Sequence, residues 1–452
     1  MQQAISYRDR DGFVIIKDHI VERYVRNSYA RDYDHLMQSG LYQHLVGEGL
    51  LIPHKERNIA GNEIPDIYKI LEPEKINFIS FPYEWSACQW KQMMLAFLQI
   101  NKICLDYGMI LKDATPFNFT FHKGSCVFFD TLSFELYDDQ KPWIAYRQFC
   151  ETMLGPLALL YFNNTLWTRM MPGFINGWPL PFISSNLPFK TWISPAILIH
   201  IHWHARVQKE KKGPVKSDGL SKEKLQILWK MIQHSVSRWA YPYKQENWLH
   251  YYHTDIQSEE YLQNKTKTIT QWLEELRPVR VIDLGANTGM FSIIASRYAE
   301  EVIAVESDHA CMTQLRQYIN LQKIENIHTV IADLAQPVPG AGWRNKEKAP
   351  LLERLKADMV FALALIHHLC ITANIPLSFV ADLFAEITTR YIVVEFIPRS
   401  DKKVREMLQN RKDIFDDYTE EEFNRCFSKR FILRNYSENN FSDRKLYVWE
   451  KK

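Results

Sequence analysis

A glycine-bearing loop between a short apolar run and a helical segment restricts the fold of this chain more than any other feature of its sequence. The loop lies in VRVIDLGANTGM at residues 279–290, and Asp283 ends the β-branched run that precedes it. Gly285 permits a sharp turn where a side chain would clash, and Gly289 lets the next helix begin close to a ligand. The sequence therefore predicts a strand, a tight turn and a helix whose N-terminus faces a bound molecule.

Apolar runs and amphipathic stretches alternate after this loop. The strand-like runs are VRVIDLGA at 279–286, EVIAVES at 301–307, DMVFALAL at 358–365 and RYIVVEFIP at 390–398. Strands that alternate with helices predict an α/β domain in which a doubly wound parallel sheet is covered on both faces. The tail at 430–451 instead has two strand-like runs around the turn-rich segment NNFSD, which predicts a terminal antiparallel hairpin.

The spacing of glycines in the loop limits the ligand. A dinucleotide-binding loop would carry a third glycine where the helix meets a pyrophosphate, whereas this loop reads GANTG and has Phe291 and Ser292 where further small residues would be expected. Glu306, at the tip of the second expected strand, is well placed to accept hydrogen bonds from both hydroxyls of a ribose. Asp333 ends the third expected strand, where a carboxylate can accept from an adenine amino group. These residues predict a nucleoside ligand without a pyrophosphate or a 2′-phosphate.

Four segments, VIDLGANTG, AVESD, IADL and DMVFALALIHHL, resemble the successive motifs of class I S-adenosylmethionine-dependent methyltransferases. The longer stretches FALALIHHLCITANIPL and EFIPRSDKKVREML are similar to bacterial nodulation-protein-like methyltransferases. The resemblance runs from near residue 260 to the C-terminus and implies a Rossmann-like methyltransferase sheet with a terminal hairpin. It also implies S-adenosyl-L-methionine as cofactor, with Asp283, Gly285, Asn287 and Gly289 on its methionine portion and backbone, Glu306 on its ribose, and Asp333 with Leu334 on its adenine.

Methyl transfer requires mainly the alignment of a nucleophile, with a base where that nucleophile must lose a proton. His367 and His368 follow the fourth expected strand, where substrate meets cofactor in an open α/β sheet, and one of them can act as that base. The alternative is that they only pack against or cap the following helix. Glu395 is a further residue that can line a substrate pocket. Asn374 and Pro376 do not form an Asn-Pro-Pro-Tyr motif, which disfavours methylation of nucleic-acid bases or glutamine.

The first half of the chain has its own motif, LKDATPFNFTFHKGSCVFFDTLSFE at 111–135. FNFTFH and SCVFFD flank the turn pair Lys-Gly and predict a β-hairpin. The hairpin is expected to bring Asp113 and Asn118, which precede it, close to Asp130, which follows it. This predicted cluster resembles the catalytic loop and the metal-binding aspartate of protein-kinase-like phosphotransferases.

By that resemblance Asp113 orients an attacking hydroxyl, while Asn118 and Asp130 hold Mg²⁺ on ATP. The sequence departs from the kinase pattern at Leu111, where that pattern has histidine, and it has no glycine-rich phosphate loop before residue 60. Lys17 is only a candidate for the lysine that grips phosphates. Two interpretations stay open: a kinase-like α+β domain, active or degenerate, and a domain that binds a substrate or a partner, with its aspartates as turn caps.

Composition limits the classes of function. A formal net charge of +2 gives no electrostatic basis for binding nucleic acid or an anionic membrane surface. The seven cysteines have no Cys-x-x-Cys pair and no zinc spacing, and the N-terminus lacks an apolar signal segment, so a cytoplasmic location is expected. HIHWH at 200–204 has no carboxylate or cysteine close by in sequence, and no metal site is predicted there.

A chain of 452 residues exceeds what one hydrophobic core serves, so more than one domain is expected. We expect an auxiliary domain at 1–220, a helical linker at 221–265 and the methyltransferase domain at 266–452, with a seam in the charged segment 208–224. The predicted activity is methylation of an oxygen or a nitrogen on a small-molecule or glycan-type acceptor. Two alternatives stay open: a bifunctional protein whose first domain phosphorylates, and a cofactor-binding protein without turnover. The sequence predicts no oligomeric state.

Overall fold

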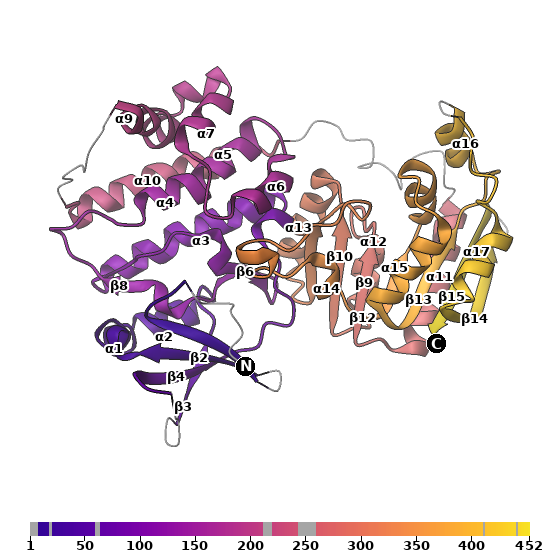
Figure 1. Cartoon of the computed structure of the whole chain (residues 1–452), viewed down its shortest axis with the longest axis horizontal. Helices are drawn as coiled ribbons and strands as arrows, with labels where there is room; N and C mark the ends of the chain where they lie inside the picture. The colour runs from indigo at the N-terminus through magenta and orange to yellow at the C-terminus, as the bar shows by residue number, and fades with distance from the viewer. Residues whose placement is uncertain are drawn as a thin grey trace. The chain divides into compact units, whose positions relative to one another are not determined.

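The computed structural model describes residues 8–17, 20–58, 64–210, 219–242, 259–409, 412–439 and 442–452. They form two compact units (Figure 1). The first unit holds the described residues up to Pro242 together with Gly340–Lys348, and the second holds the others. Part of the expected seam, 211–218, lies outside the described residues. Within these ranges, no helix combines the length and the apolar composition that a membrane crossing requires.

The first unit begins with a small antiparallel sheet. Its strands, in spatial order, are β1 (Gly12–Lys17), β2 (Ile20–Arg26), β4 (Ile67–Pro73) and β3 (His54–Arg57). Two short helices, α1 (Ala30–Gln38) and α2 (Leu41–Gly47), follow β2 in the chain. Val25 and Leu71 from the sheet pack with Tyr33 of α1 in one buried cluster. The apolar face of the sheet is therefore covered by α1.

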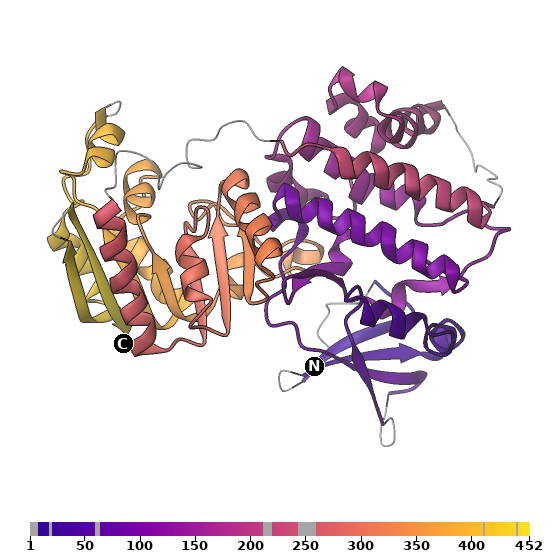
Figure 2. The same cartoon turned by 180° about the vertical axis from the view of Figure 1, so that it is seen from behind.

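The rest of the first unit is mainly helical. Helix α3 (Ala87–Asp106) starts at a capping box formed by Ser86 and Gln89, and α10 (Lys222–Arg238) packs alongside it (Figures 1 and 2). Short strands follow α3: β5 (Met109–Leu111), β6 (Phe119–His122), β7 (Ser125–Phe128) and β8 (Phe134–Leu136). The expected hairpin is confirmed as β6–β7, and its two turn residues, Lys123 and Gly124, both have positive φ.

The remaining helices of the first unit are short or irregular. The α-helices are α4 (Tyr146–Phe149), α5 (Gly155–Phe162), α6 (Trp167–Met170), α7 (Leu180–Asn186), α8 (Pro195–Ile197) and α9 (His204–Glu210). A π-helical segment, Leu198–Trp203, joins α8 to α9 and carries two of the three HIHWH histidines. This unit is thus an α+β arrangement of a small sheet followed by helices.

The second unit is built on one mixed sheet of seven strands. Their spatial order is β11 (Ile327–Ile331), β10 (Glu301–Glu306), β9 (Arg280–Leu284), β12 (Ala357–Ala362), β13 (Thr388–Phe396), β15 (Ser442–Lys451) and β14 (Phe431–Asn439). The first five are parallel, and β15 runs antiparallel to both of its neighbours. The expected parallel sheet and terminal antiparallel hairpin are confirmed. The second unit therefore has a Rossmann-like α/β fold.

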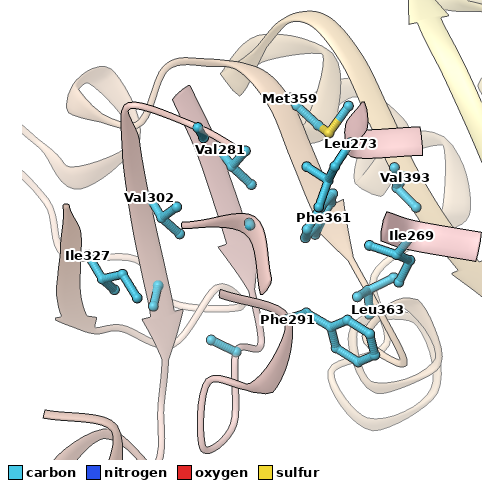
Figure 3. Close-up of a cluster of buried hydrophobic side chains, with 14 of the residues drawn as sticks. Ile269, Leu273, Val281, Phe291, Val302, Ile327, Met359, Phe361, Leu363 and Val393 are labelled. Carbon is cyan, nitrogen blue, oxygen red and sulfur yellow. The ribbon is translucent and has the colours of Figure 1, made fainter. Parts of the chain in front are cut away.

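Helices cover both faces of this sheet. On one face α11 (Glu259–Leu276), α12 (Met290–Ala295) and α13 (His309–Gln322) bury Ile269, Leu273 and Phe291 against Phe361 and Val393 (Figures 2 and 3). Side chains alternate along a strand, so the neighbours of these core residues point to the opposite face. There, aromatic residues of β15 meet α17 (Glu420–Phe427), which packs on α15 (Leu377–Ile387). The remaining helices of this unit are α14 (Leu351–Arg354) and α16 (Lys402–Gln409).

Candidate functional site

The predicted glycine loop lies at the carboxyl end of β9. Gly285, Asn287 and Gly289 have φ of 72°, 51° and 84°, a conformation that glycine and asparagine adopt more readily than other residues. A Cβ on Gly289 would lie 2.3 Å from Cδ1 of Leu315 in α13, so any other residue would force the Leu315 side chain to move. The loop therefore brings its backbone close to the sheet edge before α12 begins.

Asp283 is the second-last residue of β9, the strand before the loop, and it is almost fully buried. Its Oδ2 accepts a hydrogen bond of 2.6 Å from the Ser292 hydroxyl, one turn into α12. Burial raises the pKa of Asp283 to about 6, although the hydrogen bond from Ser292 and the charge of Lys265 act in the opposite direction. Ser292 was not among the predicted site residues, and its small side chain at the start of the helix is the signal that it could approach the strand.

Glu306 stands at the tip of β10, directly beside the loop. Its Oε2 accepts from the backbone N–H of Asn287 at 2.8 Å, and its Oε1 accepts from the N–H groups of Ser307 and Asp308 at 2.7 and 2.9 Å. Burial raises its pKa above the ordinary range, against the opposing effect of these N–H donors. The carboxylate is thus held in one orientation by backbone on both sides of the gap between two strands.

Asp333 and Leu334 follow the end of β11, the next strand outward. Oδ1 of Asp333 accepts from the backbone N–H of Ala335 at 3.0 Å, and Leu334 is buried. The residues expected on the methionine, ribose and adenine portions therefore follow three adjacent strands, β9, β10 and β11, in that order. A nucleoside with an amino-acid arm fits such a row of carboxylates beside a glycine cradle.

His367 and His368 lie in the segment after β12. Their ring centroids are 4.2 Å apart, and His367 is fully buried. Within the described part of the chain, neither ring nitrogen of His367 has a hydrogen-bond partner. Burial, with the neighbouring positive charges of Arg444 and Lys403, lowers the pKa of His367 far below its usual range, and burial lowers that of His368 to about 4. Both imidazoles are consequently neutral at neutral pH.

Glu395, which the sequence indicated for a substrate pocket, lies at the end of β13 in a buried polar network whose other members were not predicted. Glu395 accepts hydrogen bonds from Lys265 Nζ at 2.7 Å and from the Tyr261 hydroxyl, both on α11. Arg444 at the start of β15 lies beside them and donates from Nε to Oδ2 of Asp401 at 2.8 Å. A signal was present in the sequence, since Lys265 occupies a position of α11 whose helical spacing calls for an apolar side chain.

The first unit brings together the three residues of the kinase-like motif. Nδ2 of Asn118 donates to Oδ2 of Asp113 at 3.2 Å and to Oδ2 of Asp130 at 3.3 Å. Arg23 from β2 forms an ion pair with Asp130, and burial raises the pKa of Asp113. Lys17 is instead exposed at the end of β1. Arg23, which the sequence did not single out, thus brings a cation into direct contact with this cluster.

The HIHWH histidines are hydrogen-bonded within the helical part of the first unit. Nδ1 of His202 lies 2.7 Å from the Ser184 hydroxyl, its Nε2 lies 2.9 Å from the Thr191 hydroxyl, and its ring stacks on Trp192. Nδ1 of His200 lies 2.7 Å from the hydroxyl of Tyr146. Among the described residues, no group of three or more histidine, cysteine, aspartate and glutamate side chains is arranged to hold a metal ion.

The chain matches no protein-family model. It is 30% identical over 461 residues to the nodulation protein NoeA of Rhizobium meliloti (strain 1021), and the match covers 99% of this chain and 96% of NoeA. A segment of 72 residues is 35% identical to the 23S rRNA (uracil(1939)-C(5))-methyltransferase RlmD of Pseudomonas putida, covering 16% of each chain.

Two of the solved structures that the chain matches are methyltransferases. The N-methyltransferase NodS from Bradyrhizobium japonicum WM9, in complex with S-adenosyl-L-homocysteine, is 9% identical, and the match covers 46% of this chain and 99% of that chain with a TM-score of 0.33. The magnesium protoporphyrin IX methyltransferase from Synechocystis PCC 6803 with bound S-adenosylmethionine is 14% identical, and the match covers 46% of this chain and 90% of that chain with a TM-score of 0.32.

Proposed function

This chain belongs to the same family as the nodulation protein NoeA, and from that premise we propose that it is an S-adenosylmethionine-dependent methyltransferase. The acceptor we propose is an oxygen or a nitrogen of a small molecule or a sugar-containing metabolite. The observation that carries the proposal is the arrangement of Glu306 and the glycine loop at one sheet edge, with the carboxylate oriented by the N–H of Asn287. A carboxylate fixed in this way suits the two hydroxyls of an unphosphorylated ribose.

The residues at the edge of the sheet fit the cofactor portion by portion. Asp283 would hold the methionine ammonium, since its buried carboxylate gains a counter-charge there. The backbone of the loop around Gly285, where φ is positive, would contact the cofactor without a side chain between them. Glu306 would bind the ribose hydroxyls, and Asp333 with Leu334 would bind the adenine. When bound, the cofactor supplies an electrophilic methyl group on a positively charged sulfur.

The chain's own part in the reaction is to place the acceptor and to accept its proton. His367 and His368 follow β12, next to the strand that carries the glycine loop. Because burial keeps both imidazoles neutral, either can accept a hydrogen bond from an acceptor hydroxyl or amine. The same burial disfavours the imidazolium, so a proton taken up there must pass on to solvent or to a neighbouring group.

Calorimetric titration of the purified full-length protein with S-adenosylmethionine and S-adenosylhomocysteine tests the first half of this proposal. We expect one site for each ligand, and the absence of heat with both would overturn it. Release of S-adenosylhomocysteine in the presence of a panel of hydroxyl- and amine-bearing metabolites tests the second half. Tight binding without release across a broad panel would favour a cofactor-binding protein that does not turn over.

A second candidate function is phosphoryl transfer by the first unit. The observation that favours it is the meeting of Asp113, Asn118 and Asp130 within hydrogen-bonding distance. In this alternative Asp130 and Asn118 would hold Mg²⁺ on ATP, and Asp113 would orient the attacking hydroxyl. The test is Mg²⁺-dependent binding of ATP to the full-length protein, which Asp130→Ala must abolish. Binding that is absent, or that needs no Mg²⁺, would leave the first unit with a degenerate site.

A further inference from the structure

Lys265, a buried lysine on α11, uses only part of its hydrogen-bonding capacity among the described residues. The Lys265 side chain is 3% exposed, on the helix face that also buries Tyr261, Ile269 and Leu273. An apolar residue would suit this position without the cost of removing an ammonium from water. Burial, with the nearby charge of Arg444, accordingly lowers the pKa of Lys265. A cation retained at such a position requires a stabilising partner in the folded protein.

Glu395 is that partner, and it is itself held firmly. Its side chain is 1% exposed, and it accepts from Lys265, from the Tyr261 hydroxyl and from the backbone N–H of Ala364. An ammonium has three N–H donors. Within the described residues, Lys265 donates one of them to Glu395. The ring of Phe291 lies 4.8 Å from Nζ and adds a cation–π contact. The ammonium is thus positioned with donors left for a further acceptor.

The ammonium of Lys265 lies on the same side of the sheet as the methionine end of the proposed cofactor site. Asp283 lies opposite Phe361 on β12, and Phe361 lies opposite Val393 on β13, two residues before Glu395. Side chains at these positions share one face of the sheet, the face that α11 covers. The charge of Asp283 acts on Lys265. Lys265 therefore lies on the same face of the sheet as Asp283, close enough for the two charges to interact.

The methionine portion of the cofactor carries an ammonium and a carboxylate on the same carbon. Asp283 matches the ammonium, and a buried carboxylate beside it needs a cation or several N–H donors. We propose that Lys265 receives the methionine carboxylate of the cofactor while its bond to Glu395 keeps the ammonium in place. Tyr261 and Glu395 are then positioning residues for Lys265. The inference rests on the proposed function and adds to it a specificity for the amino-acid end of the ligand.

A structural role for Lys265 is the competing explanation. A cavity of about 10 Å³ lined by Tyr261, Lys265 and Glu395 has room for roughly one water molecule. In that case the remaining donors of Lys265 would serve the water, and the ion pair would only join α11 to β13. The two explanations differ in how the ligand's carboxylate affects affinity.

Calorimetry with three ligands separates them: S-adenosylmethionine, its decarboxylated analogue, and 5′-methylthioadenosine, which lacks the amino-acid group. We expect the natural chain to prefer S-adenosylmethionine over the decarboxylated analogue by roughly 10- to 100-fold, as for one charge-assisted pair. Lys265→Met should reduce this preference to within about threefold while the affinity for 5′-methylthioadenosine stays within about twofold. Lys267→Met, an exposed lysine on the same helix, is the matched control and should leave all three affinities unchanged.

The double variant Lys265→Met/Glu395→Gln guards against a loss of folding caused by an unpaired buried carboxylate. It should give the same loss of preference as the single variant. An unchanged preference for the carboxylated ligand in the double variant, or an equal loss of affinity for all three ligands, would overturn the assignment. If the natural chain binds none of the three ligands, the proposed function itself is overturned.

Discussion

The carboxylate of Glu306 accepts a hydrogen bond from the backbone N–H of Asn287, 2.8 Å away, across the gap between β10 and the loop after β9. Asn287 can present this N–H because its φ is 51°. The loop and the carboxylate therefore fix each other before a ligand arrives. Pre-orientation of this kind reduces the entropy lost on binding.

Replacement of Glu306 by alanine should weaken S-adenosylhomocysteine binding by about 1.5–3 kcal/mol, because charge-assisted hydrogen bonds to the ribose are lost. Glu306→Gln keeps the shape of the side chain but not its charge, so its affinity for S-adenosylhomocysteine should lie between those of the natural chain and Glu306→Ala. Calorimetric titration measures both. Glu300→Ala, at an exposed position just before the same strand, should bind as the natural chain does. Equal affinities for all these variants would remove Glu306 from the site.

Gly289 is the residue of the loop least able to carry a side chain. Its φ is 84°, and a Cβ would lie 2.3 Å from Leu315. Gly289→Ala should lower the free energy of unfolding by about 1–3 kcal/mol through backbone strain and overpacking. Gly47→Ala is the control, because a Cβ there has open space in α2, and a gain of up to about 1 kcal/mol is expected. Urea denaturation compares the two, and equal effects would contradict the packing argument.

Asp283 predicts a dependence of stability on pH. Burial raises its pKa to about 6, so between its unfolded value of 3.8 and about 6 the folded chain binds more protons than the unfolded chain. The contribution of Asp283 to stability is therefore most favourable below that window and declines as pH rises through it. Asp283→Asn removes this effect. The free energy of unfolding of the variant, relative to that of the natural chain, should therefore rise between pH 4 and pH 7, by up to roughly 3 kcal/mol.

The same variant should bind S-adenosylmethionine more weakly, because the methionine ammonium loses its counter-charge. Denaturant unfolding at a series of pH values and calorimetry at neutral pH give the two results. A stability difference that does not change with pH would show that Asp283 titrates alike in the folded and unfolded chains.

The second unit was largely predictable because its signals are local. A strand, a turn that needs positive φ and an amphipathic helix each depend on neighbouring residues, and Gly285 and Glu306 lie where their spacing indicated. Lys265 and Arg444 were missed because they reach the site from elements far away in sequence, α11 and β15. The available indication was that Lys265 lies on the apolar face of α11, but a position on that face does not show which residue is its partner.

The first unit illustrates the same limit. The hairpin β6–β7 was predicted from its turn pair, and it brings Asp113, Asn118 and Asp130 together as expected. Arg23 was not predicted, since nothing in the sequence of β2 indicates that its cation meets an aspartate 107 residues later. Pairings between distant segments depend on the packing of whole elements, and one sequence without relatives does not encode them in a local pattern.

The ion pair between Arg23 and Asp130 allows a test of whether the first unit holds a degenerate site or a phosphotransferase. The two side chains are 15% and 17% exposed, and Oδ2 of Asp130 also accepts from the Ser133 hydroxyl at 2.6 Å. Arg23→Met leaves this carboxylate without its cation and should destabilise the chain by about 1–3 kcal/mol. Asp130→Asn in the Arg23→Met background should recover part of that loss, because no uncompensated charge remains. Urea denaturation of the natural chain, the two single variants Arg23→Met and Asp130→Asn, and the double variant gives the coupling energy.

Mg²⁺ and ATP added to the Arg23→Met variant then separate the two interpretations. If Asp130 is a metal ligand, Mg²⁺ replaces the lost positive charge, and the midpoint of thermal unfolding should rise with Mg²⁺ and ATP together more than with either alone. If Arg23 instead replaces the metal ion beside Asp130, the midpoint of thermal unfolding should not respond to Mg²⁺ and ATP in either the natural chain or the variant. Because the ligand acts only on the folded state, a shift that persists in Arg23→Met/Asp130→Asn would place the nucleotide elsewhere.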